Sequence, residues 1–145
     1  MTTLYVAFGQ EEKGLVGSKA MVGAIEKSQV DQYCAMIDLD SFSAGRPQVL
    51  ETLSTTKLTT RTAEVAETLK IPFAKARLDI GFSDAVPFLN RKIPAVTIHG
   101  LGNEEVIHSI KDQATAVKPG SVYLGYRLAV ALIVNIDKCP CNEFR

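Results

Sequence analysis

The sequence lacks both an excess of charge of one sign and a long hydrophobic run. Its 145 residues carry sixteen basic and sixteen acidic side chains, so the formal net charge is zero and the pI is about 6.7. Without a basic cluster, the chain has no long-range attraction for the phosphates of a nucleic acid. The longest mostly apolar stretch, residues 123–136, is interrupted by Arg127 and Asn135 and is shorter than the ~20 residues of a bilayer-spanning helix. We therefore expect neither nucleic acid nor a membrane among its partners.

Cysteine is scarce, and no segment has the pattern of a signal peptide. The three cysteines are an odd number, which fits a reducing compartment better than a disulfide framework. The apolar run that starts three residues after Met1 is typical of a strand rather than of a signal peptide, so we expect a cytoplasmic protein. Cys139 and Cys141 flank Pro140 and could pair on a metal, but their position favours a frayed end of the chain.

Helical and strand patterns alternate along a chain whose residues are 46% hydrophobic. This length and composition suit one domain with a sizeable core over residues 1–145. Expected strands cover residues 4–9, 33–40, 49–53, 73–80 and 93–99, and expected helices cover residues 14–27, 59–69, 83–91 and 121–136. Residues 100–119 are expected to form a long functional loop. Interleaved strands and helices predict an α/β protein, a three-layer α/β/α sandwich with a mixed, mostly parallel central sheet.

Two adjacent carboxylates, Glu11 and Glu12, end the first apolar run just before a helical stretch. Negative charge at a helix N-terminus is favourable by up to about 1 kcal/mol, which is one explanation of the pair. A metal site is the other, because ligands of open α/β sheets gather where strands end. One carboxylate would then hold a cation while its neighbour takes a proton from metal-bound water.

Asp38 and Asp40 lie two residues apart in an expected strand, so their side chains share one face of the sheet. Aspartate is depleted in strands, and burying an unpaired charge is costly. A turn at Asp40 is the alternative to a ligand role, because aspartate also favours turns.

Four further polar residues have ordinary structural explanations. Ser83 before Asp84 is typical of a helix N-cap, although Asp84 could still orient a group in a site. His99 ends an apolar strand, where a packed or hydrogen-bonded histidine is more common than a metal ligand. His108 lies in the loop after that strand, and considered alone it has the same ordinary explanation.

Four motifs occur in an order that is more specific than any one of them. They read F-G-x-E-E-x-G-L-x-G-S from Phe8, I-D-L-D from Ile37, S-D-x-x-P-F-x-x-x-x-I-P-A-V from Ser83, and I-H-S-I-K-D from Ile107. From about residue 4 to 136 the chain resembles the catalytic half of the zinc aminopeptidases of peptidase family M28. The resemblance implies a zinc exopeptidase-like fold and a hydrolase that removes N-terminal residues from peptide substrates.

The resemblance also implies a role for each candidate residue. Two zinc ions would activate a water molecule, with Glu11 as general base. Glu12 and His108 would bind one zinc and Asp40 the other, since carboxylate and imidazole are ordinary zinc ligands. The remaining polar residues, Asp38, Asp84 and His99, would lie behind these ligands.

The chain departs from the family pattern at two places. Ser83-Asp84 is followed by Ala85 where the family often has histidine. The family's first histidine ligand and its bridging aspartate precede the glutamate pair, whereas residues 1–10 here contain no His, Asp or Glu. The sequence thus corresponds to the carboxyl-terminal part of such a domain. It leaves two alternatives open: a catalytically incomplete binding or assembly module, and a single-zinc transferase similar to glutaminyl cyclases. A sheet without its leading strands has an exposed edge, so we also expect self-association, as a symmetric dimer.

Overall fold

A mixed four-stranded sheet forms the centre of the chain. The computed structural model describes residues 1–41, 43, 45–78, 81–100, 102 and 107–145. The strands are β1 (Met36–Asp40), β2 (Pro47–Leu50), β3 (Ala74–Ala76) and β4 (Ala95–Gly100), and their order in the sheet is β1-β4-β2-β3. The pairs β1/β4 and β2/β3 are parallel, while β2 and β4 are antiparallel. The mixed, mostly parallel sheet is therefore confirmed.

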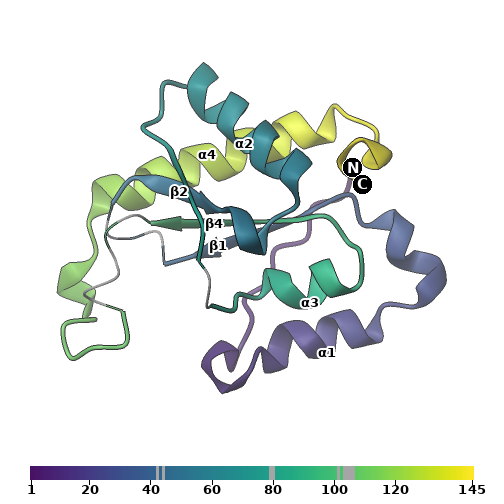
Figure 1. The fold of residues 1–145 in the computed structure, drawn as a ribbon, viewed down its shortest axis with the longest axis horizontal. Coiled ribbons are helices and arrows are strands. Elements are labelled where there is room, and N and C mark those ends of the chain that lie inside the picture. The colour runs from purple at the N-terminus through teal and green to yellow at the C-terminus, as the bar shows by residue number, and fades with distance from the viewer. Residues whose placement is uncertain (42, 44, 79–80, 101, 103–106) are drawn as a thin grey trace.

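Helices cover both faces of this sheet (Figure 1). The helices α1 (Val16–Ala24) and α3 (Ala85–Asn90) lie on one face, and α2 (Thr56–Thr68) and α4 (Pro119–Asp137) lie on the other. Each layer has its own buried cluster: Val22, Ile25, Phe88 and Ala95 on the first face; Val49, Leu58, Leu128 and Leu132 on the second. The predicted three-layer sandwich is confirmed. The 3-10 segments are η1 (Glu11–Lys13), η2 (Lys27–Gln32), η3 (Glu51–Leu53), η4 (Ala114–Ala116) and η5 (Cys141–Phe144).

The helix α4 is longer than expected, because it begins at Pro119 and ends at Asp137. Proline fits the first turn of a helix, where no backbone N–H donor is needed. With 19 residues it is long and apolar enough to cross a membrane by length and composition alone, so the expected length of this segment was too short. One face of it, with Leu128, Leu132 and Ile136, is buried in the core of the sandwich.

The strand expected at residues 4–9 is absent, since residues 1–8 form no regular element. Leu4 is 68% exposed and Tyr5 is 83% exposed. The apolar pattern was typical of a strand, but a strand also requires a neighbour for its backbone groups. Within the described residues, β1 pairs with β4 alone and is an edge of the sheet. The segment before Glu11 therefore lies outside the sheet.

The free edge of β1 presents a defined set of backbone groups. The N–H of Met36 donates to the carbonyl of Pro94, on the β4 side. Backbone groups of successive residues in a strand point to opposite sides. The N–H and C=O groups of Ile37 and Leu39 consequently point away from β4, toward the open edge.

The last residues were expected to be frayed, but the structure packs them against the rest of the chain. Cys141 forms a disulfide with Cys34, and no metal-binding group of three or more His, Cys, Asp or Glu occurs among the described residues. Phe144, in η5, is 1% exposed and belongs to the core cluster beneath α2 and α4. The sequence pattern missed this anchor because a single aromatic residue in a short segment has no periodicity.

Candidate active site

A cleft of about 460 Å³ lies at the carboxyl ends of β1 and β4. Because these two strands are parallel, both end at the same edge of the sheet, the usual place for a site in an α/β fold. The cleft is lined by five of the polar residues singled out in the sequence: Glu11, Glu12, Asp40, His99 and His108. The structure thus brings together the base and the ligands that the resemblance implies.

Glycines shape the corner that carries Glu11 and Glu12. Gly14 ends η1 with φ +96°, a conformation that L side chains rarely adopt. Gly17 donates a backbone hydrogen bond of 3.1 Å to the carbonyl of Gly9, and a β-carbon at Gly17 would lie 2.8 Å from that oxygen. The first turn of α1 therefore packs directly on the backbone before η1, and this contact fixes how the two carboxylates enter the cleft.

Glu12 and His108 lie next to each other in the cleft. His108 Nδ1 lies 3.5 Å from Glu12 Oε1, and both side chains are exposed. An exposed pair of this kind contributes at most about 1 kcal/mol to stability. The pair joins η1 to the loop after β4, at a spacing that would allow one cation to contact both side chains.

Glu11 is half-buried beside other carboxylates. Burial raises the pKa of Glu11 above 4.5, and repulsion from Glu12, Asp40 and Asp84 adds to this effect, while His108 opposes it. The carboxylate of Glu11 thus holds a proton more readily than an isolated glutamate does. This property suits a group that accepts a proton during catalysis.

The two strand aspartates have different surroundings. Asp40 lies at the cleft, where its Oδ1 accepts a hydrogen bond of 3.0 Å from the Ser41 hydroxyl. Asp38 is buried behind it, and its Oδ2 accepts a bond of 3.3 Å from the Thr97 hydroxyl. Burial raises the pKa of Asp38 to about 6, and the neighbouring charge of Asp40 contributes in the same direction.

The serine expected to cap α3 lies one residue before the N-cap position and contacts both α3 and the strand β4. The N-cap position is occupied by Asp84, without a side-chain cap. The Ser83 hydroxyl accepts a 3.3 Å bond from the N–H of Ala85 and lies 2.9 Å from the Thr97 hydroxyl. Ser83 and Thr97 thus form a buried hydrogen-bonded chain that ends at Asp38. Among the described residues, one carboxylate oxygen of Asp84 is buried and has no hydrogen-bond partner.

His99 is buried, as its position in an apolar strand predicted. Its Nδ1 lies 3.3 Å from the Nε2 of Gln48, the residue opposite it on β2. The ring also forms part of the cleft wall. His99 is thus held by a hydrogen bond within the sheet while one side of it faces the site.

Strained backbone surrounds the cleft and was not visible in the sequence. Non-glycine residues with positive φ cost of order 1–3 kcal/mol each and concentrate at functional sites. Four occur here: Gln10 at 58°, Leu15 at 60°, Ser41 at 50° and His108 at 60°. Leucine and glutamine have no preference for this conformation, so their types alone gave no signal. The strain supports the assignment of the cleft as a functional site.

The donors in the cleft are incomplete as a metal site. Among the residues described by the structure, no group of three or more His, Cys, Asp or Glu side chains could hold a metal ion. Glu12 and His108 fit as two ligands of one ion, whereas a catalytic zinc normally has three protein ligands. The described donors therefore account for only part of a zinc centre.

Three solved structures similar to this chain are aminopeptidases. BSAP, a zinc aminopeptidase from Bacillus subtilis, has a TM-score of 0.77 at 20% identity, covering 95% of this chain and 37% of its own. The LapA aminopeptidase of Legionella pneumophila has a TM-score of 0.73 at 20% identity, with coverages of 89% and 38%. An aminopeptidase from Aneurinibacillus sp. strain AM-1 has a TM-score of 0.64 at 24% identity, with coverages of 89% and 31%. At these identities the likeness shows the fold, and the chain spans little more than a third of BSAP and LapA.

The sequence itself identifies the family. A search of the curated proteins gave no match. The model of peptidase family M28 matches residues 3–133, which include all four motifs and every candidate residue in the cleft. The chain therefore belongs to peptidase family M28.

Proposed function

We propose that this chain carries the general base and part of the metal-binding set of a zinc-dependent aminopeptidase. The observation that supports the proposal is the meeting of Glu11, Glu12, Asp40 and His108 in one cleft. These residues come from three separate motifs along the chain, so their convergence is not a consequence of sequence proximity. The similar structures described as zinc aminopeptidases support the same reaction class.

Each side chain has a distinct part in the proposal. Glu12 and His108 would hold one zinc ion, and Asp40 would contribute to a second. Bound zinc would act as a Lewis acid toward the peptide carbonyl. Glu11, whose pKa is raised by burial, would accept a proton and later donate it to the leaving amine. Asp38 and Ser83, linked through Thr97, would keep β1 and β4 aligned at the floor of the cleft.

The isolated 145 residues should bind zinc weakly. A third protein ligand for the Glu12–His108 pair is not present among the described residues. We therefore expect substoichiometric, easily chelated zinc and weak or absent aminopeptidase activity for this chain alone.

Metal analysis beside an aminopeptidase assay tests the proposal. Purified chain would be incubated with zinc, passed through a desalting column and analysed by mass spectrometry for zinc per chain, and then assayed on an aminoacyl anilide. Glu12→Gln should lower the retained zinc, while Glu67→Gln, on the exposed side of α2, serves as the matched control. Zinc that the parent retains and that Glu12→Gln retains to the same extent would contradict the metal role of this cleft.

A noncatalytic binding or assembly module remains the second candidate. The shortage of metal-binding groups in the described part of the chain favours it. The two candidates differ in their response to Glu11→Gln. A noncatalytic module should keep both its binding affinity and its stability in Glu11→Gln. An aminopeptidase should lose its peptidase turnover in this variant.

A further inference from the structure

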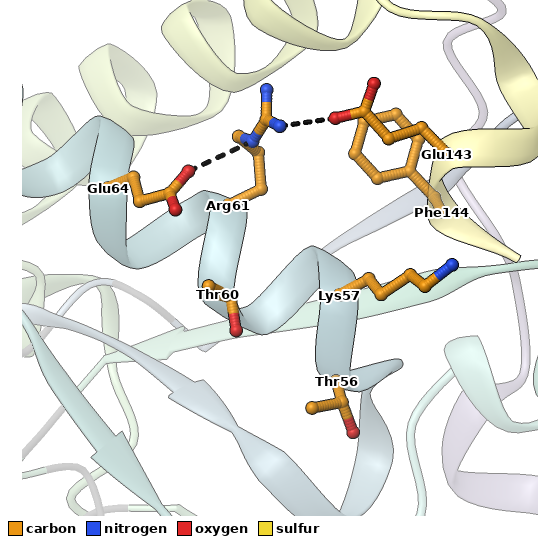
Figure 2. A pocket seen from close by; sticks show the side chains of 7 residues that line it. All are labelled: Thr56, Lys57, Thr60, Arg61, Glu64, Glu143 and Phe144. Atoms are coloured by element: carbon orange, nitrogen blue, oxygen red, sulfur yellow. Dashed lines mark hydrogen bonds and ion pairs between the residues drawn. The ribbon is translucent and has the colours of Figure 1, made fainter.

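Residues 139–145 are held against α2 by a network centred on Arg61. Figure 2 shows the Arg61 guanidinium between the carboxylates of Glu64 and Glu143, with Phe144 beside it. The same guanidinium donates a 2.8 Å bond to the side-chain oxygen of Asn135 and lies 5.8 Å from the centre of the Phe144 ring. One side chain of α2 therefore contacts both α4 and η5.

A second set of contacts fastens the segment to the chain just before β1. The guanidinium of Arg145 donates to the carbonyls of Val30 and Tyr33 at 2.8 and 2.9 Å. It also lies 3.2 Å from a carboxylate oxygen of Asp31. These partners immediately precede Cys34, whose sulfur is bonded to that of Cys141. Polar contacts and the disulfide thus act on the same two pieces of chain.

We propose that the Cys34–Cys141 pair is an oxidation-dependent lock, which keeps Phe144 in the core and residues 139–145 closed over α2. The noncovalent contacts place both thiols together before the bond forms. Phe144 brings the segment into the core, and Arg145 sets its position along residues 30–33. The bond then links positions separated by 107 residues, and a cross-link over so long a loop greatly restricts the unfolded chain.

The chemistry requires an oxidant of the disulfide class. Thiolate of Cys34 or Cys141 attacks a small-molecule disulfide, which releases one thiol and leaves a mixed disulfide. The second cysteine then attacks the protein sulfur of that intermediate and releases the other thiol. Two protein thiols lose two electrons and two protons, and the oxidant becomes two thiols. Cys139 remains a thiol, with its sulfur 3.5 Å from the carbonyl oxygen of Asn135.

The disulfide bears on the cellular compartment in which the chain is most stable. An odd number of cysteines favoured a reducing compartment, but the structure pairs two of them and leaves one free. Structural disulfides persist in oxidising surroundings. The lock therefore implies that the chain is most stable outside a reducing cytosol.

Thiol counting and thermal unfolding test this lock. The chain would be refolded in a glutathione redox buffer, trapped with a thiol-alkylating reagent under denaturing conditions and weighed by mass spectrometry. We expect one alkylated cysteine in the parent, and a tryptic peptide pair that contains Cys34 and Cys141. Dithiothreitol should lower the Tm by about 10 °C or more, as expected for a long closed loop in a domain of this size.

Matched variants separate the lock from general effects of cysteine loss. Cys139→Ser should keep the bond and the dithiothreitol effect, because it removes only the free thiol. Cys34→Ser should unfold near the Tm of the reduced parent and show no further response to dithiothreitol. If Cys34→Ser does not fold, the reduced parent supplies the same comparison. Three alkylated cysteines in the refolded parent, or a Tm that dithiothreitol leaves unchanged, would overturn the proposal.

Discussion

Neutralising Asp38 should stabilise the metal-free chain, although it removes a charge from the candidate site. The carboxyl is buried behind Asp40, and burial raises its pKa from 3.8 to about 6. A raised pKa means that the folded chain holds this proton more tightly than the unfolded chain does. Stability should therefore fall as the pH rises from about 4 to about 6, and the loss should be complete above that range.

The size of the effect follows from the two pKa values. Their difference is about 2, and each step of one in pKa corresponds to about 1.4 kcal/mol. Charging Asp38 in the folded state thus costs on the order of 3 kcal/mol at pH 7.5. Asp38→Asn keeps the shape and an oxygen for the Thr97 hydroxyl but carries no charge. We expect it to gain most of this free energy at pH 7.5 and almost none at pH 4.

Denaturant unfolding in a chelator at pH 4, 5, 6 and 7.5 measures the gain directly. Asp112→Asn is the matched control, because that aspartate is exposed. A gain that does not depend on pH would show that the amide stabilises by contacts and not by removing charge. No gain at pH 7.5 would refute the reasoning. A cation bound at Asp40 should lower the pKa of Asp38. Added zinc should therefore reduce the difference in free energy of unfolding between the parent and Asp38→Asn.

Three further predictions concern the base, the corner and the sheet edge. Glu11→Gln should lower any aminopeptidase turnover about a hundredfold or more with little change in zinc content, and equal loss of zinc in this variant and in Glu12→Gln would contradict the assignment. Gly17→Ala should destabilise the chain by about 1 kcal/mol or more, because the added β-carbon meets the Gly9 backbone. Gly23→Ala, on the same helix with open space around it, should instead stabilise the chain by about 0.5–1 kcal/mol. Similar unfolding midpoints for these two variants would contradict the close contact at Gly17. The parent chain should be a dimer in light scattering, with the β1 edge as the interface. Leu39→Pro should give a folded monomer, because proline removes an N–H that points away from β4. Leu39→Ala is the control, and a dimer that survives Leu39→Pro would exclude this edge as the interface.

The order of layers could be read from the sequence because it depends on local patterns. The helix α2 and strand β4 appear close to their expected places, since periodicity and an apolar run mark them clearly. The segment at Leu4 has an equally clear apolar pattern but forms no strand, because pairing depends on a neighbour that the pattern cannot show. The family motifs led to the cleft residues, whereas the strained backbone at Leu15 and Ser41 depends on tertiary packing and left no trace in residue type.

The disulfide divides the chain into two parts with different freedom. Residues 34–141 form a closed covalent ring that contains all four strands, α2, α3 and α4. The corner with Glu11 and Glu12, together with α1, lies outside this ring and is joined to it at one point along the backbone. It is also attached by the packing of α1 on α3, through Val22, Ile25 and Phe88, and by the exposed contact of Glu12 with His108. Local opening should therefore move Glu11 and Glu12 away from the cleft while the ring keeps Asp40 and His108 in place. The proposed base and one proposed zinc ligand can thus separate from the other two ligands without global unfolding.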